Sequence, residues 1–286
     1  MAAAANLPDL TPLAPEEADE GISETGSANG SSGSSLASLR SSILEHRREN
    51  GRRYHGMSEG NINHHLWRVT WDGDLCRSPK RNGANRVLDV GTGTGIWSID
   101  VPPNCKFEID DVDKDWTWST PFDFIFVRHM NACFASWERM LSQAYENLEP
   151  GGYIELQDNS FPLACQDGTL RPGSALERWS SLIMEGTAKM GRPVTVPAHF
   201  KRMLHDAGFV DVVEEHRVWP VNDWPRNDAL RLLGRWSQFD SLEAVESSAL
   251  ALFTRVLGWT REEVLVFCAE VRNELKDRSI HAYWNV

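Results

Sequence analysis

An aspartate and three glycines near position 90 have the residue types and spacing of a ligand-binding turn. Asp89 lies in the apolar run 87–90, and glycines follow at positions 91, 93 and 95. Glycine lets the backbone turn sharply and lets a ligand approach without meeting a Cβ atom. A helix that starts after the turn would direct its free amide groups at an anionic or polar ligand. The pattern therefore predicts a binding turn at the carboxyl end of a strand.

The spacing and the acid indicate which ligand the turn suits. The dinucleotide fingerprint is GxGxxG, whereas here the third glycine comes one residue early and Ile96 takes its place. A carboxylate at Asp89 would repel a pyrophosphate but can accept hydrogen bonds from an ammonium group. S-adenosyl-L-methionine carries an amino acid and a sulfonium instead of phosphates, so we expect this cofactor. A nicotinamide site and a turn without a ligand are the alternatives.

Strands and helices that alternate along the chain would position this turn. Apolar runs at 86–90, 105–109, 122–129 and 153–158 predict strands, with residues 122–129 covered on both faces. Apolar residues recur at helical spacing from Ser136, and we expect Gly151 and Gly152 to end that helix. This order predicts an α/β fold with a mostly parallel sheet and flanking helices.

Further elements are expected before and after this region. Helices are predicted from Leu36 to a cap at Gly51, through Leu66 and Val69 to a turn at Asp72-Gly73, over 198–207 before Gly208, and as a pair within 241–276. Thr260 and Glu263 form a capping-box pattern for the last helix. Residues 209–219 predict another strand, and the stretch before 198 is expected to be rich in loops.

The overall composition limits the class of protein. A net charge of −12 and a pI of about 5.2 argue against strong non-specific binding to nucleic acid or to anionic membranes. The five cysteines form no CxxC pair, which predicts neither a disulfide framework nor a metal site. Residues 1–35 have the composition of a disordered acidic, Ser/Gly-rich tail, and 36–286 are expected to form one domain. We find no secretory or membrane-spanning pattern, and expect a protein of the cytosol or, by partnership, the nucleus.

Several blocks of the chain resemble one known family. RVLDVGTGTGIW, VPPNCKFEIDDVDKDWTW, FDFIFVRHM, LEPGGYIELQD, LFTRVLGWTREEV and DRSIHAYWNV are similar to blocks of the fungal LaeA-like methyltransferases. The resemblance implies a Rossmann-like class I methyltransferase fold that uses S-adenosyl-L-methionine. It also implies an oxygen or nitrogen acceptor on a small molecule of secondary metabolism. One subgroup works with velvet regulators in the nucleus, so a regulatory protein partner is a second expectation.

The resemblance also implies roles for individual residues. The cofactor-binding residues it implies are Asp89, Gly91, Thr92, Gly93 and Gly95 at the methionine end, Asp110 or Asp111 with Val112 beside the adenine, and Arg128 under the sulfonium. His129 follows Arg128 and is the candidate catalytic base, because an imidazole titrates near neutrality. A hydrogen-bonded structural histidine is the alternative, since transfer from a sulfonium often needs only alignment.

Three parts of the family pattern are missing, one of them within the linker YHGMSEGNINHHLW, which is shorter than in the family. Asp100 runs directly into Pro102 and Pro103, where the family has a helix and a second strand whose acid grips the ribose. The final strand likewise extends past YWNV in the family. Asp110 stands 19 residues after Gly91 and offers a substitute ribose acid. We therefore predict an incomplete second and final strand, weak or no activity, and as the alternative a methyltransferase-fold regulator that acts through protein partners.

Overall fold

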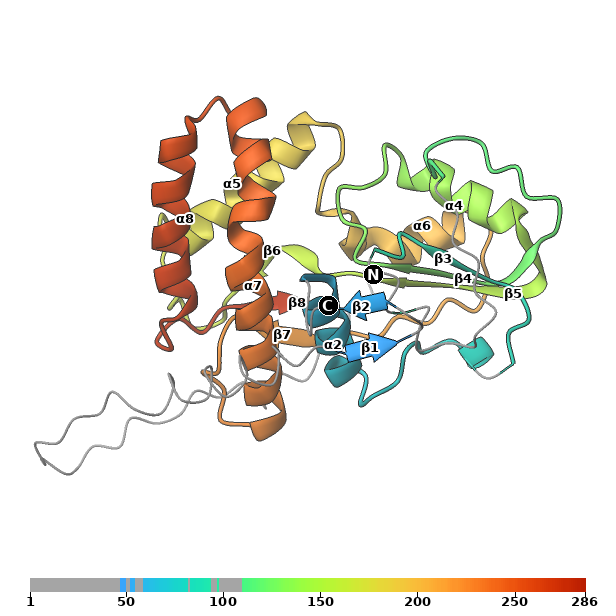
Figure 1. Ribbon diagram of the computed structural model, residues 1–286, viewed down its shortest axis with the longest axis horizontal. Helices are drawn as coiled ribbons and strands as arrows, with labels where there is room; N and C mark the ends of the chain where they lie inside the picture. The colour runs from blue at the N-terminus through green and yellow to red at the C-terminus, as the bar shows by residue number, and fades with distance from the viewer. Residues whose placement is uncertain (1–46, 50–51, 55–58, 82, 94–96, 98–109) are drawn as a thin grey trace, which may run out of the picture.

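The computed structural model describes residues 47–49, 52–54, 59–81, 83–93, 97 and 110–286. Two groups of elements lie side by side in Figure 1: a sheet with α4 and α6 over it, and a group of long helices, α5, α7 and α8. Strands β6, β7 and β8 and helix α2 lie between the two groups. Within the described ranges, no helix has both the length and the apolar character needed to cross a bilayer.

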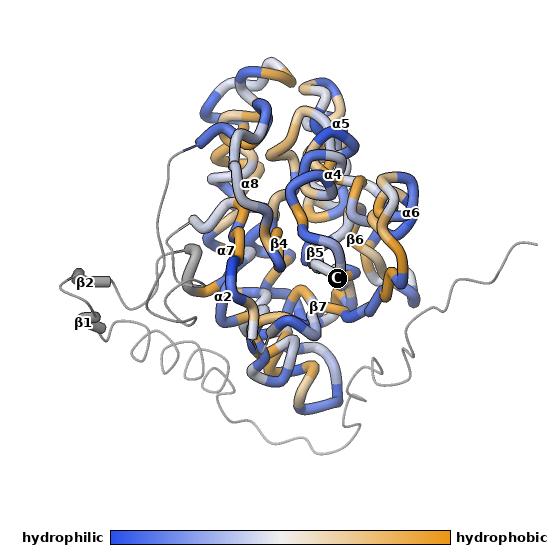
Figure 2. The backbone as a smooth tube through the Cα atoms, turned by 90° about the vertical axis from the view of Figure 1, so that its right-hand side faces the viewer, coloured by the Kyte–Doolittle hydropathy of each residue, from blue (hydrophilic) through white to orange (hydrophobic). Residues whose placement is uncertain are grey.

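The first sheet is parallel and carries the glycine turn. Its order is β3 (Val87–Val90), β4 (Phe122–Arg128) and β5 (Leu148–Gln157). All residues of β4 except the last are buried, as expected for a strand covered on both faces, and its tube is mostly orange in the interior in Figure 2. The register pairs Val90 with Val127 and Arg128 with Gln157, so the carboxyl ends of the three strands meet at one edge.

Helices α4 (Trp137–Glu146) and α6 (Phe200–Asp206) pack on one face of this sheet. Helix α4 begins where the Ser136 side chain accepts a hydrogen bond from the Arg139 amide, and it buries one apolar stripe. The stripe consists of Trp137, Met140, Leu141 and Ala144. On the opposite face the Trp97 ring stacks on Phe126, with ring centroids 4.5 Å apart.

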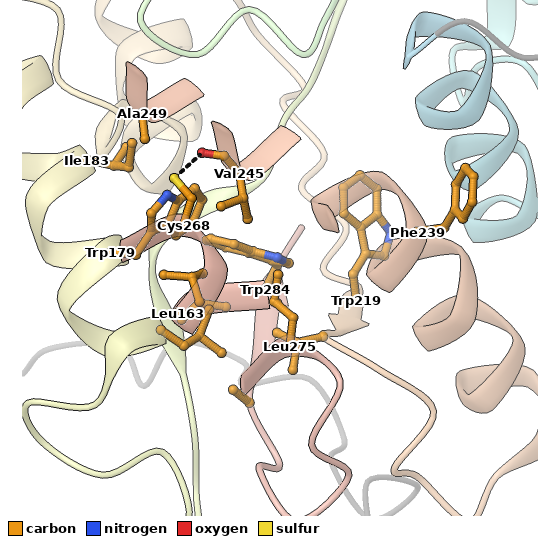
Figure 3. Packing of buried hydrophobic residues seen from close by; sticks show 14 of the residues in the cluster. Leu163, Trp179, Ile183, Trp219, Phe239, Val245, Ala249, Cys268, Leu275 and Trp284 are labelled. Atoms are coloured by element: carbon orange, nitrogen blue, oxygen red, sulfur yellow. Dashed lines mark hydrogen bonds between the residues drawn. The ribbon is translucent and has the colours of Figure 1, made fainter. Parts of the chain in front are cut away.

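The second sheet is antiparallel and belongs to the larger core. Its order is β6 (Ser160–Ala164), β8 (Tyr283–Asn285) and β7 (Val218–Pro220). It packs with α2 (Glu59–Thr70), α5 (Ala175–Lys189), α7 (Asp228–Arg255) and α8 (Arg261–Leu275). Figure 3 shows this core from close by, including Trp179, Trp219 and Trp284. The remaining elements are β1 (Arg47–Glu49), β2 (Arg52–Tyr54), η2 (Pro79–Arg81) and η3 (Val196–His199).

Most of the predicted elements are confirmed. Helix α2 ends in a turn at Asp72 and Gly73, which have φ angles of 53° and 95°. The Thr260–Glu263 capping box begins α8, and α7 ends before Gly258. The expected strand at 105–109 lies outside the described residues, as does most of the helix expected from Leu36. Residues 47–49, at the end of that predicted helix, instead pair with 52–54 as antiparallel strands.

Three further predictions are wrong. Gly151 and Gly152 do not end α4, because Asn147 already caps it and both glycines lie within β5. The strand expected at 209–219 is reduced to 218–220, since Asp211 has a φ of 54° that interrupts the extended backbone. The stretch before residue 198 contains the 15-residue helix α5, whose N-cap is Ser174.

Candidate functional site

The glycine turn leads directly out of β3. Gly91 and Gly93 have φ angles of 76° and 54°, a region that side chains with a Cβ rarely adopt. A Cβ at Gly91 would overlap the Met130 sulfur, whereas for one at Gly93 the nearest atom of the described residues is the Gly91 carbonyl oxygen at 3.9 Å. Both glycines are exposed and Thr92 between them is half-buried. The backbone of the turn is therefore open to a ligand, and Gly95 lies outside the described residues.

Asp89 and Arg128 form the charged part of the site. Asp89 lies in β3 in register with Phe126, and its half-buried carboxylate stabilises the Arg128 cation at the end of β4. Burial nevertheless lowers the pKa of Arg128 to about 10, against the opposing effect of Asp89 and Glu155. The guanidinium also lies 5.5 Å from the centre of the Phe126 ring.

Helix α2 supplies a partner for this cation that the sequence did not reveal. The Arg128 Nη2 atom lies 2.8 Å from His64 Nδ1. A guanidinium can only donate, so His64 Nδ1 accepts and the proton of a neutral ring is on Nε2. His64 is 4% exposed, and its neighbour His65 instead packs against Trp236 in α7. The two histidines face different parts of the fold, as adjacent residues of a helix must.

His129 begins the turn after β4. Its φ is 57°, its amide donates to the Gln157 carbonyl at 2.8 Å, and its side chain is 44% exposed. Desolvation and the neighbouring Arg128 cation lower the pKa of the imidazole below its ordinary value. The ring is therefore neutral at pH 7 and can accept a hydrogen bond, but it is a weaker base than a free imidazole.

Asp158, just after β5, is the site residue that sequence reasoning missed. Its side chain is 1% exposed and accepts hydrogen bonds from the Met130 amide (2.9 Å), Asn131 Nδ2 (2.8 Å) and the Asn159 amide (2.9 Å). Its Oδ1 atom lies 3.9 Å from His129 Nδ1. The signal available in the sequence was an acid at the end of a predicted strand of the sheet, a signal similar to that at Asp89.

The predicted adenine-side residues lie near the same edge. Asp110 and Asp111 are exposed, and Val112 is half-buried against the core under α4. The following residue, Asp113, accepts a hydrogen bond from the Ala135 amide at 3.0 Å. This contact joins the segment to the turn after β4. Among the described residues, no group of three or more His, Cys, Asp or Glu side chains is arranged to hold a metal ion.

The tryptophans of this region are mostly core residues. Trp97 is 5% exposed, and Trp116 and Trp118 are half-buried against the core under α4. Trp219 and Trp224 are buried, and their Nε1 atoms donate to Thr70 Oγ1 and the Ala282 carbonyl.

A glycine turn, an acid and a buried cation at the carboxyl edge of a parallel sheet define a class of nucleotide-type binding folds. Residues 73–215, half of the chain, match the family model described as a methyltransferase domain. The chain belongs to this family, and with its parallel sheet and flanking helices it has the Rossmann-like class I methyltransferase fold.

Its relatives include fungal proteins of secondary metabolism. The chain is 33% identical to "Methyltransferase pytC" of Aspergillus terreus, with 88% of this chain and 89% of the relative covered. It is 32% identical to "Probable methyltransferase tdiE" of Emericella nidulans (79% and 78% covered). It is 31% identical to "Secondary metabolism regulator LAE1" of Cochliobolus heterostrophus (83% and 92% covered). The predicted resemblance to LaeA-like methyltransferases is confirmed.

These alignments also show that the chain is short within the matched span. The alignment with pytC extends over 290 positions, whereas 88% of this 286-residue chain is about 252 residues. About 38 positions of that relative therefore have no counterpart here. For LAE1 the alignment has 281 positions against about 237 residues of this chain, which leaves about 44 positions. That the missing residues fall near Asp100 stays a prediction, because 98–109 lie outside the described residues.

Proposed function

We propose that this chain is an S-adenosyl-L-methionine-dependent methyltransferase that acts on an oxygen or nitrogen of a small molecule of fungal secondary metabolism. The observation that carries the proposal is the exposed turn at Gly91 and Gly93 directly after Asp89. When bound, the cofactor would supply a methyl group on a sulfonium for in-line displacement by the acceptor.

The donor end of the site fits an aminoacyl group. The Asp89 carboxylate can accept from an ammonium, and the backbone at Gly93 is reachable because no Cβ stands over it. Arg128 lies between Asp89 and Glu155 and provides a positive charge near the turn. A phosphate-bearing cofactor would bring its negative charge beside the Asp89 carboxylate, which repels it, and this is why we favour the sulfonium donor over a nicotinamide.

Two amide side chains near the end of β5 are held in place by the hydrogen bonds that they donate. Asn131 Nδ2 donates to Asp158 Oδ1 and to the Asn159 carbonyl, so its Oδ1 must point elsewhere. Gln157 Nε2 donates to Glu155 Oε1, which fixes that amide in the same way. Among the described residues both amide oxygens are buried without a hydrogen-bond partner, so they are out of reach of an acceptor. Methylation of oxygen or nitrogen therefore rests on the resemblance to the LaeA-like methyltransferases.

Calorimetry with S-adenosylhomocysteine tests the donor site directly. We expect binding by the full-length chain and at least about tenfold weaker binding by Asp89→Ala, because at least one charge-assisted hydrogen bond is lost. Asp228→Ala, at the exposed first turn of α7, is the control and should bind like the unmodified chain. Unaltered binding by Asp89→Ala would contradict the assigned role of this acid.

A regulator with little or no methyl transfer is the second candidate, supported by the shortened chain and the likeness to LAE1. Loss of a ribose-binding acid would remove charge-assisted hydrogen bonds worth about 1.5–3 kcal/mol each. We therefore expect weak donor binding and slow transfer. Incubation with methyl-labelled donor and a fungal metabolite extract separates the two: label in a small molecule supports the enzyme. A dissociation constant for the donor in the micromolar range or lower would contradict the expected weak binding.

A further inference from the structure

The turn after β4 is bound to the end of β5 through one side chain. Residues 129–132 contain two left-handed conformations, at His129 (φ 57°) and Ala132 (φ 58°). Such a backbone is costly for residues with a Cβ and needs surrounding contacts to hold it. Asp158 supplies those contacts, because one oxygen accepts from the Met130 amide and the other from Asn131 Nδ2.

Asn131 and His129 complete the attachment. Asn131 Nδ2 also donates to the Asn159 carbonyl at 2.7 Å, and the His129 amide donates to the Gln157 carbonyl at 2.8 Å. The end of β5 therefore holds three consecutive residues of the turn. Asp158 is the only side chain among the described residues that binds two of them.

The turn at 129–132 also contacts the glycine turn on the donor side of the site. The Met130 side chain fills the space that a Cβ at Gly91 would occupy, so Met130 and the glycine turn touch. A shift of the Met130 backbone would move this side chain away from Gly91. The path from Asp158 to the glycine turn thus has two steps, one hydrogen bond and one van der Waals contact.

We propose that Asp158 is a positioning residue of the transfer site, which holds the 129–131 turn so that Met130 packs against Gly91 and the glycine turn keeps its binding shape. Its influence on donor affinity rests on the proposed function; its hold on the turn does not.

Protonation of Asp158 offers a readout that a purely structural residue would lack. Burial raises the pKa of this carboxyl to about 7, although the three donors favour the ionised form. Facing groups are the His129 ring at 3.9 Å and the Cys133 thiol, whose pKa is raised by burial and by Asp158. The next charged groups are Arg192 and Asp113, which form an ion pair with a nitrogen–oxygen distance of 2.8 Å. Because the packed turn raises this pKa, it binds the proton more tightly than a loosened, more solvated turn would, so the turn should loosen as pH rises through about 7 and Asp158 ionises.

The test compares Asp158→Asn with Asp123→Asn over pH 5.5–8.5 by calorimetry with S-adenosylhomocysteine. Asp123 is a buried carboxylate at the other end of β4, where it accepts from the Asn85 and Arg86 amides. For the unmodified chain and Asp123→Asn we expect affinity to fall as pH rises through neutrality. Asp158→Asn should bind about tenfold more weakly at pH 6, the equivalent of one hydrogen bond, without that pH dependence. Equal affinity and an equal pH profile for both variants would overturn the proposal.

Alkylation of Cys133 tests whether Asp158 holds the turn, and it does so without relying on donor binding. This thiol is exposed, its amide donates to the Met130 carbonyl, and it lies in the turn in question. Peptide-resolved mass spectrometry should show severalfold faster reaction with iodoacetamide in Asp158→Asn than in Asp123→Asn, because the turn loosens and a nearby negative charge is gone. If the unmodified chain binds no S-adenosylhomocysteine, the proposed function fails while this rate still decides the role of Asp158. An unchanged alkylation rate overturns the positioning role of Asp158. If Asp158→Asn does not fold, Asn131→Ala is measured in its place, and we expect the same acceleration.

Discussion

Arg128 at the end of β4 donates a hydrogen bond of 2.8 Å to His64 Nδ1 in α2, and this bond joins the parallel sheet to the helical part of the fold. The guanidinium is half-buried between the carboxylates of Asp89 and Glu155, which stabilise its charge. A neutral acceptor suits this position, because a second cation would compete with Arg128 for the same carboxylates. The pair therefore positions one of the predicted donor-binding residues.

Replacing His64 by alanine should destabilise the chain by about 1–3 kcal/mol, because the half-buried guanidinium loses an acceptor. His64→Asn should recover part of this loss, since its amide oxygen can take the place of Nδ1. Urea unfolding measures both. His65→Ala removes a ring that packs on Trp236 at 4.2 Å and serves as the neighbouring control. If donor affinity falls equally in His64→Ala and His65→Ala, the contact between His64 and Arg128 does not contribute to donor binding.

Gly91→Ala is expected to be more harmful than Gly168→Ala, although both glycines have a φ of 76°. The two variants share the backbone cost of about 1–2 kcal/mol. Only at position 91 does the new Cβ overlap Met130, since nothing lies within 4 Å of the same atom at Gly168. The overlapped atoms are the sulfur and methyl at the flexible end of Met130, so we expect an additional loss of about 1 kcal/mol or less in unfolding free energy.

Met130→Ala tests the cause of that excess. When it is combined with Gly91→Ala, the methyl group of the alanine gains room and the extra destabilisation should disappear. Donor affinity should stay low in the double variant, because Met130 no longer supports the turn. Additive losses of stability in the double variant would show that the overlap is not responsible.

Much of the donor side could be predicted from sequence because its signals are local. A strand followed by closely spaced glycines predicts its own backbone, and Gly91 and Gly93 have the positive φ angles that such a turn requires. The end of β4 could be placed for the same reason, since an apolar run of this length forms a central strand.

The missed features depend on contacts between distant residues. His64 and Arg128 are 64 positions apart, and Asp158 binds a turn 27–28 positions before it, so no spacing rule links them. Helix α5 was missed because Trp179, Ile183 and Gly186 face a core built from three other helices, which only the assembled fold defines. Asn147 ends α4 earlier than the glycine pair suggested, because residues after it already pair with β4.

Ionisation of Asp158 should make the unfolding free energy of the chain depend on pH. Its folded-state pKa of about 7 lies above the ordinary value of 3.8, so the folded chain binds the proton more tightly than the unfolded chain. This group therefore lowers the unfolding free energy as pH rises from about 4 to about 7, by a few kcal/mol. Urea unfolding at several pH values should show this decline, and Asp158→Asn should lack it. A decline that persists in Asp158→Asn would have to come from other groups.

Thr70→Val tests the core independently of the site. Thr70 and Thr187 are each 6% exposed, and each hydroxyl donates to the carbonyl four residues earlier at 2.7 Å. Only Thr70 also accepts a bond among the described residues, from Trp219 Nε1 at 2.7 Å. Thr70→Val leaves this buried indole without an acceptor, so it should cost about 1–3 kcal/mol more than Thr187→Val. Chemical denaturation measures the difference, and S-adenosylhomocysteine affinity should be the same in both variants because Trp219 belongs to the helical core. Equal stability of the two would mean that the indole finds another acceptor.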